Sequence, residues 1–262
     1  MGNHSHDHHD SPARVSSPEE RELLKPFVDN LHAFLTEALG GVDGPIAEIG
    51  AGDGVLAERL RADGFDVVAI DAHAKTAVAA TDQGRRVDHA DWLTWDGGGS
   101  APFAALIFTR SLHHIDPLNI AAEQMQRLAP GGLLIADEFD FERVDAPGAQ
   151  FMMDSASLLD AAGMRDGDGA VANNPLDAWR TRMTVDHHVA SGADLMTAIE
   201  GVAEIESIEH GNCMAQLALW RIDTAHPNAI AVRDFLTETE KARTESGAME
   251  KMGMRIIARL KS

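Results

Sequence analysis

Short, nearly continuous apolar runs alternate with longer segments of helical spacing through the first half of the chain. The runs that predict buried strands span 45–51, 66–72, 103–109 and 133–139, with a shorter strand over 86–92. The segments that predict helices span 17–41, 54–64, 75–84 and 119–132. This alternation predicts an α/β fold, in which helices cover both faces of a parallel sheet.

The alternation of strand-like and helical segments ends after Phe139. About sixty residues with helical patterning of their own precede the next strand-like run, 203–210. An insertion of that size predicts a cap, so we interpret 17–262 as a single domain with 140–200 as a substrate-facing cap. The run 213–222 fits a strand or a buried helix equally well, and 253–262 predicts a final strand.

The N-terminal segment 1–16 is polar and rich in histidine. It gains too little burial to offset its ordering entropy, so we expect a disordered tail. Its histidines and aspartates could also bind a divalent metal weakly.

Charge and composition limit the classes of binding partner and the cellular location that we expect. The formal net charge of −20 repels polyanions, so neither nucleic acid nor an anionic membrane surface is an expected partner. A single cysteine, Cys213, excludes an internal disulfide and suits a reducing compartment. No apolar stretch approaches a membrane span, so we expect a soluble, cytoplasmic protein. Its oligomeric state is left open.

A glycine-rich loop follows the first predicted strand, with Glu48 leading into Gly50, Ala51, Gly52, Asp53 and Gly54. A dinucleotide-binding loop needs a third small residue where this chain has Val55. A carboxylate at Glu48 disfavours a pyrophosphate and favours a cationic ligand. The pattern therefore argues against an NAD-dependent oxidoreductase.

Two further acids end the next two predicted strands. Asp71 can accept hydrogen bonds from both hydroxyls of a ribose. Asp91 can accept from an adenine amino group, and Trp92 offers a flat apolar surface. Each acid also has a structural alternative, since Glu48 and Asp91 could cap a helix or turn and Asp71 could simply face water.

Glu48 with its glycines, Asp71, the 90–92 stretch, the loop 109–115 and the run 128–138 together resemble class I S-adenosylmethionine-dependent methyltransferases. The resemblance implies a Rossmann-like seven-stranded sheet of order 3-2-1-4-5-7-6 with an antiparallel last strand, and a helical excursion at 212–250. It also implies S-adenosylmethionine as cofactor and S-adenosylhomocysteine as product. The residues that it places around the cofactor are Glu48 at the methionine end, Gly50, Ala51, Gly52, Asp53 and Gly54 beneath it, Asp71 and Ala72 at the ribose, Asp91 and Trp92 at the adenine, and Thr109 and Arg110 beside the sulfonium.

Methyl transfer from a sulfonium mainly requires alignment and exclusion of water, and a base is needed only if the acceptor must lose a proton. The candidate catalytic residues are His114, Glu138 and His188, chosen from a wider set that includes His113, Asp140 and His187. Acids near Glu138 lack a recognisable metal-ligand spacing, so no metal is expected.

We therefore interpret the chain as a methyltransferase that acts on an O, N or C nucleophile of a small, partly apolar molecule. Methionines in and beyond the cap could line an adaptable acceptor pocket, or could be ordinary core. A non-catalytic S-adenosylmethionine-binding module and a protein-directed methyltransferase stay open as alternatives.

Overall fold

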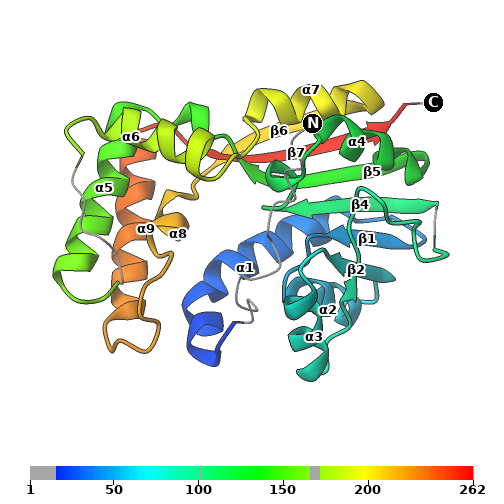
Figure 1. Cartoon of the computed structure of the whole chain (residues 1–262), viewed down its shortest axis with the longest axis horizontal. Coiled ribbons are helices and arrows are strands. Elements are labelled where there is room, and N and C mark those ends of the chain that lie inside the picture. The colour runs from blue at the N-terminus through cyan, green and yellow to red at the C-terminus, as the bar shows by residue number, and fades with distance from the viewer. Residues whose placement is uncertain (1–15, 101, 166–171, 262) are drawn as a thin grey trace, which may run out of the picture.

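A twisted sheet of seven strands, in the order β3-β2-β1-β4-β5-β7-β6, forms the centre of the molecule (Figure 1). The computed structural model describes residues 16–100, 102–165 and 172–261. The strands are β1 (Ile46–Ile49), β2 (Val67–Asp71), β3 (Asp88–His89), β4 (Phe103–Thr109), β5 (Leu128–Phe139), β6 (Ala203–Gly211) and β7 (Gly253–Leu260). Only β7 runs antiparallel to its neighbours, which confirms the predicted fold and strand order.

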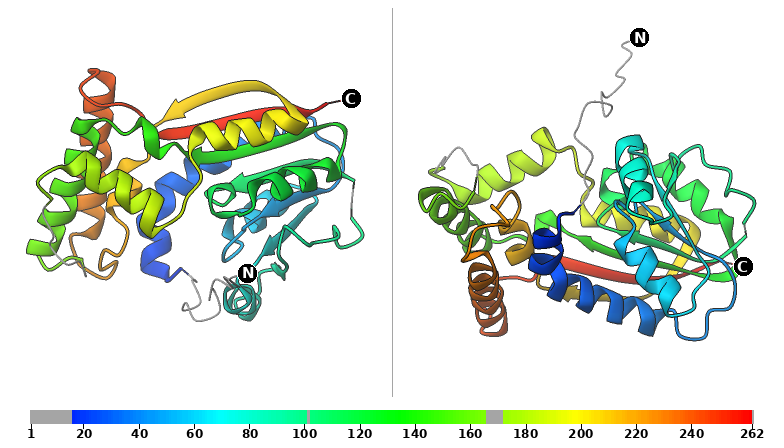
Figure 2. Two further views of the ribbon diagram at one scale, coloured as in Figure 1. Left: turned by 45° about the horizontal axis from the view of Figure 1, so that its top comes forward. Right: turned by 90° about the horizontal axis from the view of Figure 1, so that it is seen from below.

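Helices cover both faces of the sheet, as expected for strands that are apolar on both sides. One face packs against α1 (Pro18–Ala38), α2 (Val55–Ala62) and α3 (Ala74–Asp82), which share an apolar cluster with β1 and β2. The opposite face packs against α4 (Leu118–Gln124) and α7 (Gly192–Val202), and Figure 2 shows α7 lying along the sheet.

Two sequence predictions need correction in this half of the fold. The helix expected over 119–132 ends at Gln124, and after a 3₁₀ turn, Met125–Arg127, the chain is already in β5 at Leu128. Pro130 lacks an N–H group and favours an extended residue before it, which suits a strand end better than a helix end. The strand expected over 86–92 is reduced to the two residues of β3.

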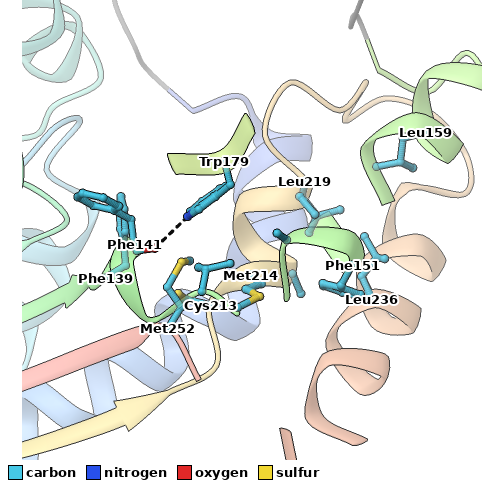
Figure 3. Packing of buried hydrophobic residues seen from close by; sticks show 14 of the residues in the cluster. Phe139, Phe141, Phe151, Leu159, Trp179, Cys213, Met214, Leu219, Leu236 and Met252 are labelled. Atoms are coloured by element: carbon cyan, nitrogen blue, oxygen red, sulfur yellow. Dashed lines mark hydrogen bonds between the residues drawn. The ribbon is translucent and has the colours of Figure 1, made fainter. Parts of the chain in front are cut away.

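Beyond one end of the sheet, five helical segments of the described residues form a third apolar cluster (Figures 1 and 3). They are α5 (Ala146–Ala161), α6 (Pro175–Thr181), the π-helical turn η5 (Arg182–Asp186), α8 (Met214–Ala218) and α9 (Ala229–Glu245). The buried indole of Trp179 donates to the carbonyl oxygen of Phe141 at 3.0 Å, joining α6 to the segment that leaves β5. We call these segments the cap.

The extent of the cap differs from the predicted 140–200. Leu195 and Ile199 of α7 are buried against the sheet, so α7 covers the sheet rather than the cap. Helices α8 and α9, which lie in the excursion expected at 212–250, complete the cap instead. Because β5 and β6 run in the same direction, the excursions after them leave from the same edge of the sheet.

The remaining predictions have mixed outcomes. The ambiguous run 213–222 contains α8, a helix, and the final strand is β7. The histidine-rich segment 1–16 lies, except for Ser16, outside the described residues. Among the described helices, none is long and apolar enough to cross a membrane.

Candidate active site

The glycine loop between β1 and α2 turns through left-handed backbone at Gly50, Gly52 and Gly54, with φ values of 72°, 57° and 73°. A side chain at Gly50 would collide with Cβ of Ser111 at 2.4 Å, and one at Gly54 with Val87. At Gly52, no atom of the described part of the chain lies within 4 Å of the corresponding position. Two glycines therefore allow close packing, and the third leaves open space above the loop.

Asp71 fixes this loop to the end of β2. Its two carboxylate oxygens accept from the N–H groups of Gly52 and His73, each at 2.8 Å. Asp71 is only partly buried, and each oxygen keeps a second acceptor site. The carboxylate can therefore order the loop and still accept hydrogen bonds from two ligand hydroxyls.

Glu48 lies beneath the same loop and is only 1% exposed. Among the residues that the structure describes, its Oε2 has no hydrogen-bond partner. Burial raises the pKa of Glu48 to about 8, although the charge of Arg61, the hydroxyl of Thr109 and the N–H of Ala57 oppose this shift. A buried carboxyl with an unpaired oxygen is costly, so the site is suited to a polar or cationic group that supplies the missing partner.

The other loop residues have backbone or structural contacts. The N–H of Ala51 donates to the carbonyl oxygen of Ile70, and Ala72 is exposed at the end of β2. Asp53 pairs with Arg85 at 3.4 Å and accepts from the N–H of Ser16 at 3.1 Å. Its carboxylate therefore holds the loop in place from the outside.

Asp91 and Trp92 follow β3 but differ in exposure. Asp91 is exposed and accepts from the N–H of Leu93 at 2.9 Å, and the preceding residue, Ala90, donates to the carbonyl oxygen of Asp71. Trp92 is 3% exposed, contacts the ring of Phe108 edge-on, and donates from its indole to Ala121. Trp92 is thus part of the core, and its contact with adenine stays a prediction.

Hydrogen bonds to β1 and β5 hold the loop after β4 in place. The hydroxyl of Ser111 donates to the carbonyl oxygen of Ile49 at 2.6 Å, which joins this loop to the glycine loop. Oε1 of Glu138 accepts from the N–H groups of Ser111 and Leu112, and its Oε2 lies 2.5 Å from Nδ1 of His113. Glu138 is fully buried and these contacts fix the loop after β4, so its role as a catalytic base stays a prediction.

The other two predicted bases lie on adjoining segments. His114 is exposed in the 3₁₀ turn Leu112–His114, and its ring centroid is 4.0 Å from that of His113. The N–H of Ala190 donates to the carbonyl oxygen of His113, which brings the segment between η5 and α7 against this turn. His188 is two residues away, exposed and in left-handed backbone with φ 51°.

Thr109 ends β4, and Arg110 follows it beside the glycine loop. Arg110 has a φ of 54°, and its guanidinium pairs with Asp137 at 3.1 Å. Asp137 also pairs with Arg255 of β7 at 2.8 Å. The carboxylate thus holds two arginines at the edge where β4, β5 and β7 meet.

Sequence reasoning missed Ser111 and the ion pairs of Asp137. A hydroxyl directly after the fourth strand was a usable signal for Ser111, because that edge of the sheet also carries the glycine loop. The partners of Asp137 come from β4 and β7, which are far apart in the sequence. No local pattern could have paired them.

Within the described ranges, no three histidine, cysteine or acidic side chains converge as metal ligands would. The polar groups at the carboxyl ends of the parallel strands are instead carboxylates and backbone groups. These suit a ligand with hydroxyl and cationic groups better than one with phosphates.

Residues 20–187 match the family model described as a methyltransferase domain. A curated relative, the ubiquinone biosynthesis O-methyltransferase of Caulobacter sp. (strain K31), is 33% identical over 134 residues. The match covers 48% of this chain and 50% of the relative, so the chain spans about half the length of this curated relative.

Solved methyltransferase structures share the fold at low identity. Geranyl diphosphate C-methyltransferase from Streptomyces coelicolor A3(2) is 14% identical with a TM-score of 0.57, covering 96% of this chain and 91% of that one. The N-methyltransferase NodS from Bradyrhizobium japonicum WM9 is 14% identical with a TM-score of 0.52, covering 94% of each chain. With the strand order and the family match over 20–187, these findings place the chain in the class I S-adenosylmethionine-dependent methyltransferase family.

Proposed function

We propose that this protein binds S-adenosylmethionine and transfers its methyl group to a small, partly apolar molecule. The observation that carries the proposal is that Glu48 is a buried carboxyl with an oxygen unpaired among the described residues. It lies next to the glycine loop, which Asp71 orders through the N–H of Gly52. A cationic ligand would supply the missing partner of Glu48.

Different residues would bind different chemical groups of the cofactor. When bound, S-adenosylmethionine supplies a methyl group on a sulfonium, which is already a good leaving group. Glu48 would hold the ammonium, Asp71 the ribose hydroxyls and Asp91 the adenine amino group. The backbone of Gly50–Gly54 and of Thr109–Arg110 would border the ligand, with Trp92 supporting the adenine side from the core.

The acceptor would bind between the loop after β4 and the cap, close to His114 and His188. Either imidazole could remove a proton from an acceptor that must lose one. The named relatives include O-, C- and N-methyltransferases, so the fold leaves the acceptor atom open.

Calorimetric titration with S-adenosylhomocysteine tests the cofactor site. We expect binding by the wild-type protein and a loss of at least about a hundredfold in Asp71→Ala, which removes two backbone contacts as well as the ribose acceptors. Asp88→Ala, an exposed acid on the neighbouring strand, serves as the matched control. Equal affinity in both variants would contradict the assignment of Asp71.

A second experiment tests the acceptor class. The protein is incubated with S-adenosylmethionine labelled in its methyl group and with a cell extract separated into small molecules and macromolecules. Label in a small molecule, reduced in His114→Ala or His188→Ala, supports the proposal. Label only in protein favours a protein-directed enzyme, and cofactor binding without any labelled product favours a non-catalytic module.

A further inference from the structure

Pro26 interrupts the hydrogen bonds of α1. Proline has no N–H, so the carbonyl oxygen of Glu22, four residues earlier, loses its helical donor. Arg233 of α9 takes that place, because its Nη1 donates to the carbonyl oxygens of Glu22 and Leu23, both at 3.1 Å. Arg233 is only 9% exposed, so these contacts are largely shielded from water.

The two halves of α1 on either side of Pro26 pack against different parts of the molecule. Before it, Leu23 is 2% exposed and belongs to the apolar cluster of the cap. After it, Asp29 pairs with Arg59 of α2 at 2.8 Å, and Leu35 is buried against the sheet. Figure 2 shows α1 running from beside the cap helices to beneath the sheet.

The start of α1 also contacts the glycine loop. Ser16, directly before the helix, donates its N–H to Oδ2 of Asp53 at 3.1 Å. Ser17 then caps the helix by accepting from the N–H of Glu20. A short segment, 16–25, therefore connects the cap, through Arg233, with the loop that would carry the cofactor.

We propose that Arg233 is a positioning residue for the cofactor, which binds the Glu22 carbonyl that Pro26 leaves without a helical donor, and the adjacent Leu23 carbonyl, to hold segment 16–25 against the glycine loop. Movement of the cap would then be transmitted to the cofactor, so that occupation of the acceptor side and retention of the cofactor are coupled. This inference rests on the proposed function for its ligand, but its mechanical part concerns the free protein.

The test compares Arg233→Met, which keeps an apolar stem without donors, with Arg233→Lys and with Arg243→Met, an exposed arginine on the same helix. We expect Arg233→Met to weaken S-adenosylhomocysteine binding about tenfold, Arg233→Lys to recover part of that loss, and Arg243→Met to bind like wild type. Hydrogen exchange should speed up at 16–25 and at 50–54 in Arg233→Met. Unchanged affinity together with faster exchange confined to the cap would overturn the inference.

Pro26→Ala separates positioning from stability. The new N–H can bond to the carbonyl oxygen of Glu22 and compete there with Arg233, so the helix gains stability while Arg233 is held less firmly. We expect weaker S-adenosylhomocysteine binding, whereas a merely structural role for Arg233 predicts unchanged or tighter binding. If wild type itself does not bind, the proposed function fails, and hydrogen exchange of the free Arg233→Met and Pro26→Ala proteins still decides whether segment 16–25 is held in this way.

Discussion

The carboxylate of Glu138 on β5 lies 2.5 Å from Nδ1 of His113, and both side chains are almost completely buried. With its other oxygen, Glu138 accepts two backbone N–H groups from the loop after β4. This one side chain therefore satisfies three donors and fixes the turn that presents His114.

Replacing Glu138 with leucine should leave those three donors without a partner. We expect a loss of about 3–5 kcal/mol in the free energy of unfolding, measured by urea denaturation. Glu142→Leu, an exposed glutamate on the same segment, should change the stability by less than about 0.5 kcal/mol. Comparable stability for the two variants would show that Glu138 does not hold the loop.

The raised pKa of Glu48 should appear in the pH dependence of the free protein. Because its pKa is about 8 in the folded state and near 4.5 otherwise, the folded state binds the extra proton. Stability should fall as pH rises from about 4.5 to 8, at up to about 1.4 kcal/mol per pH unit. Glu48→Gln should flatten this slope, which thermal unfolding at several pH values can measure.

The same residue predicts the pH dependence of ligand binding. Only the ionised carboxylate attracts the ammonium of S-adenosylhomocysteine, so affinity should rise between pH 6 and 8 in the wild-type protein. In Glu48→Gln it should be weaker and nearly independent of pH over that range. An identical rise in both proteins would assign the titration to another group.

Glu240 of α9 should stabilise the short helix α8. Its carboxylate is 2% exposed and accepts from the N–H groups of Cys213, Met214 and Ala215 at 2.8–2.9 Å. Glutamine offers only one acceptor oxygen, so Glu240→Gln should cost about 1–3 kcal/mol in urea denaturation. Glu238→Gln changes an exposed glutamate on the same helix and serves as the control. An equal loss of stability in both variants would argue against the role of Glu240 at the start of α8.

Two glycines of α7 should respond oppositely to alanine. A Cβ at Gly192 would lie 2.4 Å from Cγ of Asp140, which is buried and accepts from the N–H of Gly192. At Gly201, nothing lies within 4 Å. Gly192→Ala should therefore lower stability by about 1–3 kcal/mol, and Gly201→Ala should raise it by about 0.5–1 kcal/mol. Thermal unfolding that shifts in the same direction for both would contradict the close contact at Asp140.

The sequence alone was enough to predict most of the strands and the location of the glycine loop, because both depend on local signals. The order of the strands in the sheet was predicted only through the resemblance to class I methyltransferases. Apolar runs of strand length define β1, β2, β4 and β5, and glycines mark the positions where the backbone must turn through left-handed conformations. The acids Glu48, Asp71 and Asp91 were found in the same way, since each lies in or near the end of a predicted strand.

The tertiary structure decided which of these side chains are accessible and what holds them. Glu138, a predicted candidate base, is enclosed with His113, and Trp92 is buried in the core. Arg233 reaches the Glu22 carbonyl, which Pro26 leaves without a helical donor, across 211 residues. Burial and pairing of this kind depend on contacts between segments that are distant in the sequence, and the apolar periodicity of the chain does not encode such contacts. Strands and turns form because of neighbouring residues, so the local pattern of the sequence does predict them.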